Sequence, residues 1–228
     1  MLMPMSGLST KKVGAAVAMI LALASFAPAQ NRDNRNKEKV DKVRIKDRFD
    51  VGLAYSGVFS KTSTASQSSV TLKPTTSGAA LGTVRYHFNP THAVEVNFGH
   101  THNSQVFTAP PDTFRVNNGI TEFSAAYVLS PFHSRRIDPF FLAGGGSLKF
   151  NPGNQYIDGV LSPFAAKSQT SLAALYGGGL DYWLWKHLAL RVQYRGLIYK
   201  TPDFSVPGLH LGVYGHMAEP TAGLVIKF

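Results

Sequence analysis

The sequence predicts an all-β chain that folds as an eight-stranded antiparallel up-and-down transmembrane β-barrel. Three observations support this prediction. Large apolar side chains recur at every second position in eight segments, short and long connections alternate along the chain, and an apolar segment near the N-terminus has the form of an export signal. The 228 residues include 21 glycines, as expected for β structure with tight turns, and no cysteine, which excludes a disulfide scaffold and a thiolate metal site.

The N-terminal segment is predicted to be a signal peptide covering residues 1–29. Two lysines precede an apolar run over residues 13–27, which is too short for a spanning helix and suits the core of an export signal. Ala27-Pro28-Ala29 then provides small residues at the positions that signal peptidase requires, so Gln30 would begin the mature chain. An uncleaved membrane anchor is the alternative reading of this run.

The next segment, residues 30–48, is predicted to be a charged periplasmic lead-in. Its eight basic and four acidic residues give a net charge of +4, and it has almost no apolar side chains to bury. Because the whole chain carries +10, removing this +4 and the two signal lysines leaves 10 − 4 − 2 = +4 for residues 49–228. That mild charge and the predicted export argue against nucleic acid as a partner.

Residues 49–228 are predicted to form the barrel domain. The first segment sets the pattern, because Phe49, Val51 and Leu53 would share one face while Asp50 and Gly52 share the other. In the fifth segment we expect Phe140, Leu142, Leu148 and Phe150 to face outward, opposite Lys149. The eight predicted strands cover 49–60, 80–88, 94–99, 122–129, 140–150, 176–184, 188–198 and 221–228.

The connections between these strands indicate how the barrel lies in a membrane. Short turns are expected at 89–92, 130–138 and 185–187, and long links at 61–77, 103–115, 151–168 and 200–215. This alternation puts every long link at one end of an antiparallel meander. A soluble up-and-down barrel such as a lipocalin would show the same alternation, with the apolar side chains facing inward and the polar side chains facing water. Glycines beside charged residues on one face favour the narrow polar lumen of a membrane barrel.

The chain ends in TAGLVIKF, which resembles the C-terminal insertion signal of bacterial outer-membrane barrels through Thr221, Gly223, Ile226 and Phe228. With the export signal and eight strands, residues 49–228 resemble the OmpA/OmpX-like family of eight-stranded outer-membrane β-barrels. The resemblance implies insertion into the cell outer membrane by periplasmic chaperones and the barrel-assembly machinery. It also implies that both termini face the periplasm and that the long loops face outward. We further expect a monomer without a cofactor, in contact with outer-membrane lipid and lipopolysaccharide.

Charged residues on the predicted inner faces fall at two depths, and each layer has two positive and two negative side chains. Buried charges require partners because desolvation costs several kcal/mol for each isolated ion. We therefore expect two ion-pair clusters that plug the lumen. The first reading of function is a structural or surface-interaction role in the cell envelope, and the alternative is a small porin-like channel. The predicted clusters are Arg85, Glu95, Asp181 and Arg191 near the short turns, and Glu122, Lys149, Arg195 and Glu219 further out.

The stretch His100-Thr101-His102-Asn103 raises the possibility of an enzyme. Lipid A deacylases, which are also outer-membrane barrels, have His-x-Ser-Asn, and here histidine stands at the serine position. Ser104 is expected on another face or in the loop, so the sequence predicts no catalytic residue, and a lipid A-modifying enzyme is the third reading. Two histidines without a third ligand do not predict a metal site.

Five cations are expected near the outer rim, where they could pair with lipopolysaccharide phosphates or remain solvated loop charges. They are Lys61, Lys73, Arg115, Lys167 and Lys200.

Overall fold

A computed structural model describes residues 48–65, 69–134 and 136–228. The predicted signal peptide, residues 1–29, and all of the predicted lead-in except Arg48 lie outside the described residues. Within the described ranges, no helix is long and apolar enough to cross a bilayer.

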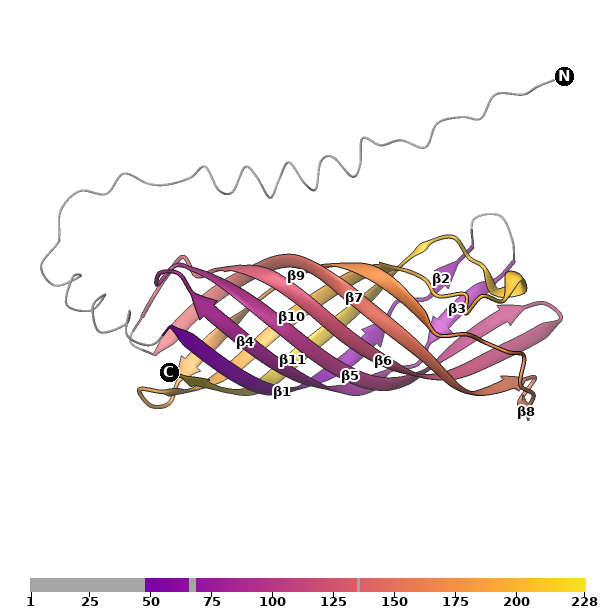
Figure 1. Ribbon diagram of the computed structural model, residues 1–228, viewed down its shortest axis with the longest axis horizontal. Helices are drawn as coiled ribbons and strands as arrows, with labels where there is room; N and C mark the ends of the chain where they lie inside the picture. The colour runs from indigo at the N-terminus through magenta and orange to yellow at the C-terminus, as the bar shows by residue number, and fades with distance from the viewer. Residues whose placement is uncertain (1–47, 66–68, 135) are drawn as a thin grey trace, which may run out of the picture. The chain divides into compact units, whose positions relative to one another are not determined.

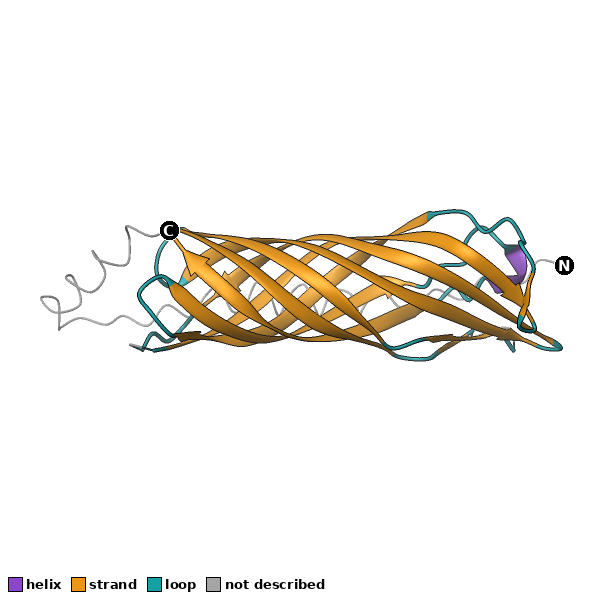
Figure 2. Ribbon diagram, turned by 90° about the horizontal axis from the view of Figure 1, so that it is seen from below, coloured by secondary structure: helices purple, strands orange, loops and turns teal. Residues whose placement is uncertain are grey.

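The described chain forms a closed barrel of eight antiparallel strands, which confirms the predicted fold class (Figures 1 and 2). Each strand pairs with its neighbours in sequence, and β1 closes the ring by pairing with both β4 and β11. The barrel strands are β1 (Phe49–Ser60), β4 (Ser77–His87), β5 (His92–Ala109), β6 (Asp112–Leu129), β7 (Ile137–Ile157), β9 (Gln169–Trp183), β10 (Leu188–Lys200) and β11 (Tyr214–Lys227).

The apolar faces of most strands point outward, as expected for a barrel surrounded by lipid. Leu53, Tyr55 and Phe123 are more than half exposed, whereas Asp50 on the opposite face of β1 is buried. The three short turns all lie at one end of the barrel, the left end in Figure 1, where the C-terminus also lies. In the first turn, Asn89 Oδ1 accepts the backbone N–H groups of the two residues that lead into β5.

The long links differ from the prediction at two places. The segment predicted as a loop over 103–115 is mostly strand, because β5 and β6 stay paired up to Ala109 and Asp112. The link predicted over 151–168 begins as strand too, since β7 extends to Ile157. The prediction was wrong because polar side chains continue the period-two pattern here, and their backbone groups still pair across the sheet.

Several short elements lie at the long-loop end of the barrel, at the right in Figure 1. The hairpin of β2 (Ser63–Thr64) and β3 (Thr71–Pro74) joins the sheet through pairing of β3 with β5. Strand β8 (Val160–Leu161) pairs with β7, and the 3-10 helix η2 (Pro207–Leu209) lies in the link before β11.

Strand β7 has the opposite orientation from the one predicted. Phe140, Leu142, Leu148 and Phe150 are buried in the lumen, and Lys149 is exposed on the outer face. Phe140 and Phe141 are adjacent and equally apolar, so the period-two pattern fits either face. The glycines that follow have no side chain to decide between them. The structure resolves the ambiguity by packing the four apolar side chains inside.

Candidate functional site

The centre of the site is a group of charged side chains in the lumen near the short-turn end, which we call the inner cluster: Asp50, Arg85, Glu95, Asp181 and Arg191. Glu95 Oε2 accepts hydrogen bonds from Arg85 Nη2 at 2.7 Å and from Arg191 Nη1 at 3.2 Å. Asp181 forms a two-bond pair with Arg191, at 2.6 Å to Nε and 2.8 Å to Nη2. All five side chains are at most 5% exposed, and each of the three carboxylates lies within 3.6 Å of a guanidinium nitrogen.

The inner cluster contains all four residues predicted for it from sequence, and it adds Asp50. Asp50 Oδ1 lies 3.6 Å from Arg191 Nη2, and its other oxygen lies 2.7 Å from His87 Nε2. Asp50 stands on the polar face of β1, and its pairing in register with Arg85 of β4 brings it into the cluster. The ring of Phe140 completes the packing, with the Arg85 guanidinium 4.3 Å from its centroid.

A second group, the central cluster, lies further along the lumen and consists of Glu122, Ser124, Arg195 and Glu219. Arg195 donates to Glu219 Oε2 at 3.0 Å and to Glu122 Oε1. Ser124 Oγ donates to the same Glu122 oxygen at 2.6 Å. The structure does not bring Lys149 here, so the prediction that Lys149 completes this cluster was wrong. Arg195 alone faces two carboxylates.

The outer part of the lumen is apolar and forms what we call the apolar plug: Phe107, Phe150, Tyr199, Phe204 and Leu209. Phe204 belongs to the link between β10 and β11 and is fully buried, with its ring centroid 6.2 Å from Phe107 and 6.5 Å from Phe150. Gln169 Oε1 holds this link by accepting the backbone N–H groups of Asp203 and Phe204 at 3.0 Å each. The sequence indicated a long loop here but not that it folds into the barrel mouth.

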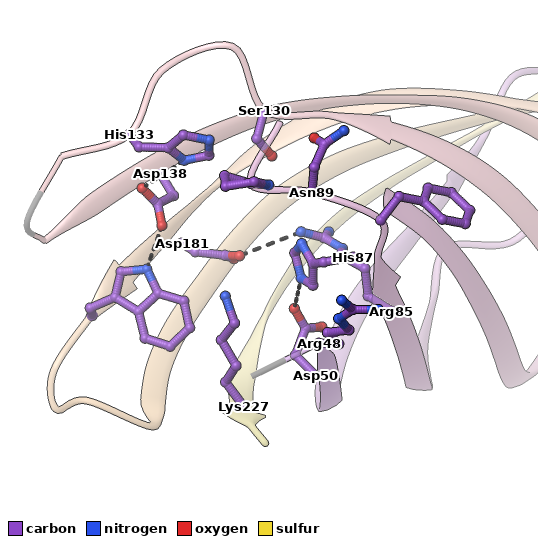
Figure 3. A pocket seen from close by; sticks show the side chains of 13 residues that line it. Arg48, Asp50, Arg85, His87, Asn89, Ser130, His133, Asp138, Asp181 and Lys227 are labelled. Carbon is purple, nitrogen blue, oxygen red and sulfur yellow. Dashed lines mark hydrogen bonds and ion pairs between the residues drawn. The ribbon is translucent and has the colours of Figure 1, made fainter. Parts of the chain in front are cut away.

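A small cavity of about 30 Å³ opens beside the inner cluster at the short-turn end (Figure 3). Its wall includes the Asp50–His87 pair, the contact of Asp181 with Arg85, and Asp138, which accepts the Trp183 indole N–H at 2.7 Å. This volume holds one or two water molecules and is not a continuous pore. The inner cluster therefore forms the floor of a shallow vestibule.

The histidine motif lies on the outer face of the barrel. His100, His102 and Ser104 all point outward from β5, so the expectation that Ser104 lies on another face or in a loop was wrong. The reason is that residues two apart in a strand share a face, and β5 continues past Ser104. Ser104 Oγ donates to Asn117 Oδ1 at 2.7 Å, and the two histidine rings are 4.8 Å apart. In the described part of the chain, no group of three or more His, Asp or Glu is placed to hold a metal ion.

The C-terminal residues form the seam that closes the barrel. Thr221 is buried and donates to Ser56 Oγ at 3.0 Å, whereas Ile226 and Phe228 are exposed on the outer face. A Cβ at Gly223 would lie 2.4 Å from the backbone oxygen of Leu53, so only glycine fits this crossing. The seam accounts for the glycine at this position, and the role of the four residues as an insertion signal stays a prediction.

Comparisons with known proteins agree with this architecture. Neisserial surface protein A has a TM-score of 0.52 at 15% identity, over 79% of this chain and 97% of that one. OprG from Pseudomonas aeruginosa has a TM-score of 0.51 at 13% identity, over 80% of this chain and 96% of that one. At these identities the likeness concerns the fold, and a search of curated protein sequences gives no match. The family model for the outer membrane protein beta-barrel domain matches residues 15–214, and the chain therefore belongs to that family.

Proposed function

We propose that this protein is a closed, non-conducting barrel of the outer membrane, with a role in envelope structure or surface interaction. The observation that carries the proposal is the inner cluster, in which Arg85 and Arg191 share the carboxylates of Glu95 and Asp181 across the lumen. A permeant ion would have to separate these pairs or cross the apolar plug behind them. Separating a buried pair leaves an uncompensated charge at a cost of about 3–5 kcal/mol.

The second candidate function is a small channel, and one layer of the lumen favours it. Asn97 and Gln193 lie two residues along their strands from Glu95 and Arg191, between the two charged clusters. Both side-chain amides are buried, and neither has a hydrogen-bond partner among the described protein atoms. Buried amides of this kind are normally satisfied by internal water, which would form the middle of a water path.

A liposome-swelling assay separates the two functions. Protein expressed from the full-length chain is purified from outer membranes and reconstituted in liposomes, and swelling in isotonic arabinose is followed by light scattering. A closed barrel gives the swelling rate of empty liposomes, while a known porin gives fast swelling as the positive control. Fast swelling by this protein would favour the channel.

We further propose that the predicted signal peptide is removed before insertion and that the C-terminal strand is read by the barrel-assembly machinery, with periplasmic chaperones as earlier partners. The exposure of Phe228, beside the strand that closes the barrel, supports the proposed recognition of the C-terminal strand. N-terminal sequencing of the outer-membrane fraction should begin at Gln30. Deletion of Phe228 should lower the amount of inserted barrel, and an unchanged amount would contradict the assembly role.

We propose that the protein is a monomer and does not catalyse a reaction. The Ser104 hydroxyl donates a hydrogen bond to the amide oxygen of Asn117. An amide oxygen cannot act as the general base that a serine nucleophile requires. Mass spectrometry of lipid A from cells with and without the protein checks this point. Loss of an acyl chain only in the presence of the protein would favour a lipid A-modifying enzyme.

A further inference from the structure

The outer face of β5, β6 and β7 carries a polar surface at the level where the apolar belt ends. The strands pair residue by residue, so their outward side chains form rows across the wall. Phe98 and Phe123 form an apolar row. Two residues further along β5, the next row is His100, Thr121 and Lys149, and all three are outward-facing and polar.

The polar surface continues for several rows beyond this boundary. His102, Gly119 and Asn151 form the second row, and Ser104 pairs with Asn117 in the third. The register between β6 and β7 shifts between Val116 and Asn118, so the regular pairing of these two strands is interrupted at this level. The next outward row contains Arg115, which pairs with Val106, and Val106 also pairs with Lys73 of β3.

These rows border an open hollow of about 650 Å³ on the barrel surface. Its wall includes His100, His102, Ser104, Asn117, Gly119 and Asn151. Gly119 has no side chain, and a Cβ added there would lie in ordinary van der Waals contact with His102 Nε2, at 3.6 Å, so a larger side chain would extend into the hollow. Lys149 stands beside the inner edge of the hollow and Arg115 beyond its outer edge. Thr121, which pairs with Lys149, lies six residues from Arg115 along β6, or about 20 Å at ~3.4 Å per residue.

We propose that this surface, formed by His100, His102, Ser104, Asn117 and Lys149 together with Arg115, binds the phosphorylated sugar headgroup of an outer-leaflet lipid A. The location fits, because the headgroup of such a lipid lies directly beyond the hydrocarbon layer. The chemistry also fits. Lysine and arginine at opposite edges pair with separate phosphates, and the imidazole, amide and hydroxyl groups between them bind sugar hydroxyls.

The other wall of the barrel has a different outer surface and so offers an internal comparison. Its outward-facing His216 is already bonded to a neighbouring side chain, with Nε2 2.8 Å from the Tyr176 hydroxyl. On β1, β10 and β11, the outward positions toward the long-loop end carry Phe59, Ile198 and Tyr214, which are 49%, 41% and 75% exposed. Lys200 is an exposed cation on that wall, opposite Tyr214 in the β10–β11 pair. It therefore provides a matched control for loss of a surface charge outside the hollow. The site does not depend on a closed lumen, because the side chains proposed to bind the lipid all point outward.

The test is native mass spectrometry of delipidated protein, purified after expression of the full-length chain and titrated with bisphosphorylated lipid A. We expect R115Q/K149Q to weaken lipid A binding about tenfold or more, because two phosphate contacts are lost. We expect G119L to weaken it as well without any change of charge, because leucine fills the hollow. K200Q should bind like the unmodified protein. A heat-dependent gel shift checks that each variant is folded.

Three outcomes would overturn the proposal. Dephosphorylated lipid A might bind as tightly as the phosphorylated form, R115Q/K149Q might match K200Q, or phosphatidylglycerol might compete as well as lipid A. The last result would show a general preference for anionic lipid. If G119L fails to fold, the double variant and the dephosphorylated lipid still decide the question, since neither alters the hollow.

Discussion

The two ends of the lumen are filled in different ways. The inner cluster fills the short-turn end with paired charges, whereas the apolar plug fills the long-loop end with aromatic and aliphatic side chains around Phe204. The stability of the inner cluster depends on the geometry of its ion pairs, because each guanidinium must lie within hydrogen-bonding distance of its carboxylates. The stability of the apolar plug depends on the buried apolar area. The hydrophobic effect is non-directional, so this end tolerates rearrangement of its side chains.

This difference predicts where the barrel is sensitive to change. Losing one member of the inner cluster leaves other charges unpaired in a narrow, desolvated space. Losing one member of the apolar plug leaves a cavity that the link between β10 and β11 can partly fill, since that link is not held in the strand ladder. Loss of one side chain should therefore lower the free energy of unfolding more at the short-turn end than at the long-loop end.

The largest effect is expected for Glu95→Ala, because Glu95 is fully buried and accepts from both Arg85 and Arg191. Its removal should lower the free energy of unfolding by about 3–5 kcal/mol. Urea unfolding of the refolded barrel in detergent, followed by tryptophan fluorescence, measures this change. A loss below about 1 kcal/mol would mean that water reaches the two arginines and that the inner end is not a dry plug.

Phe204→Ala should have the second largest effect. Replacing a buried phenylalanine by alanine commonly costs about 3–5 kcal/mol, and we expect about 3 kcal/mol here because the link can collapse into the space. Hydrogen exchange of the backbone amides of Asp203 and Phe204, which donate to Gln169, measures the loss. If exchange is unchanged, Phe204 does not hold the link in the mouth.

A smaller effect at the outer end depends on pH. Burial raises the pKa of Asp203, but hydrogen bonds from His210 and the Ser205 amide outweigh it, so the pKa of Asp203 is lowered. Its stabilising contribution is therefore present above the unfolded pKa of about 4 and is lost as pH falls through the folded value. For an exposed pair we expect less than about 1 kcal/mol.

Hydrogen exchange of the same link at pH 6 and pH 3, corrected for intrinsic rates, tests this expectation. Protection should decrease at pH 3 in the unmodified protein. In Asp203→Asn it should be low at both values. Equal pH dependence in both proteins would assign the effect to another group.

The smallest effect is expected for Lys149→Ala. Lys149 lies on the outer face and belongs to neither lumenal cluster, so the free energy of unfolding in detergent should change by less than about 0.5 kcal/mol. The same urea assay measures it beside Glu95→Ala. A loss of unfolding free energy comparable to that of Glu95→Ala would place Lys149 among the lumenal charges, where the alternation in the sequence predicted it.

The sequence was a reliable guide where period-two alternation was unambiguous. The number of strands, the short turns and the inward orientation of Arg85 and Arg191 all follow from that pattern. It failed on β7, where Phe140 and Phe141 are adjacent and the glycines carry no directional information. It also missed Asp50, whose role depends on its neighbours in β4 and β10 and not on its own strand.

The apolar plug was out of reach of sequence reasoning for a different reason. Phe204 contacts Phe107 and Phe150, which are far away in the chain, and it lies in a link without periodicity. Such contacts are set by long-range packing. Alternation within one segment cannot indicate them.

Single-channel recording in planar bilayers tests the closed lumen most directly. Protein that shows the heat-dependent gel shift of a folded barrel is inserted and held at constant voltage in concentrated salt. We predict a silent membrane for the unmodified protein. Stable, reproducible conductance steps from folded protein would contradict the account, because they would show that ions pass both the inner cluster and the apolar plug.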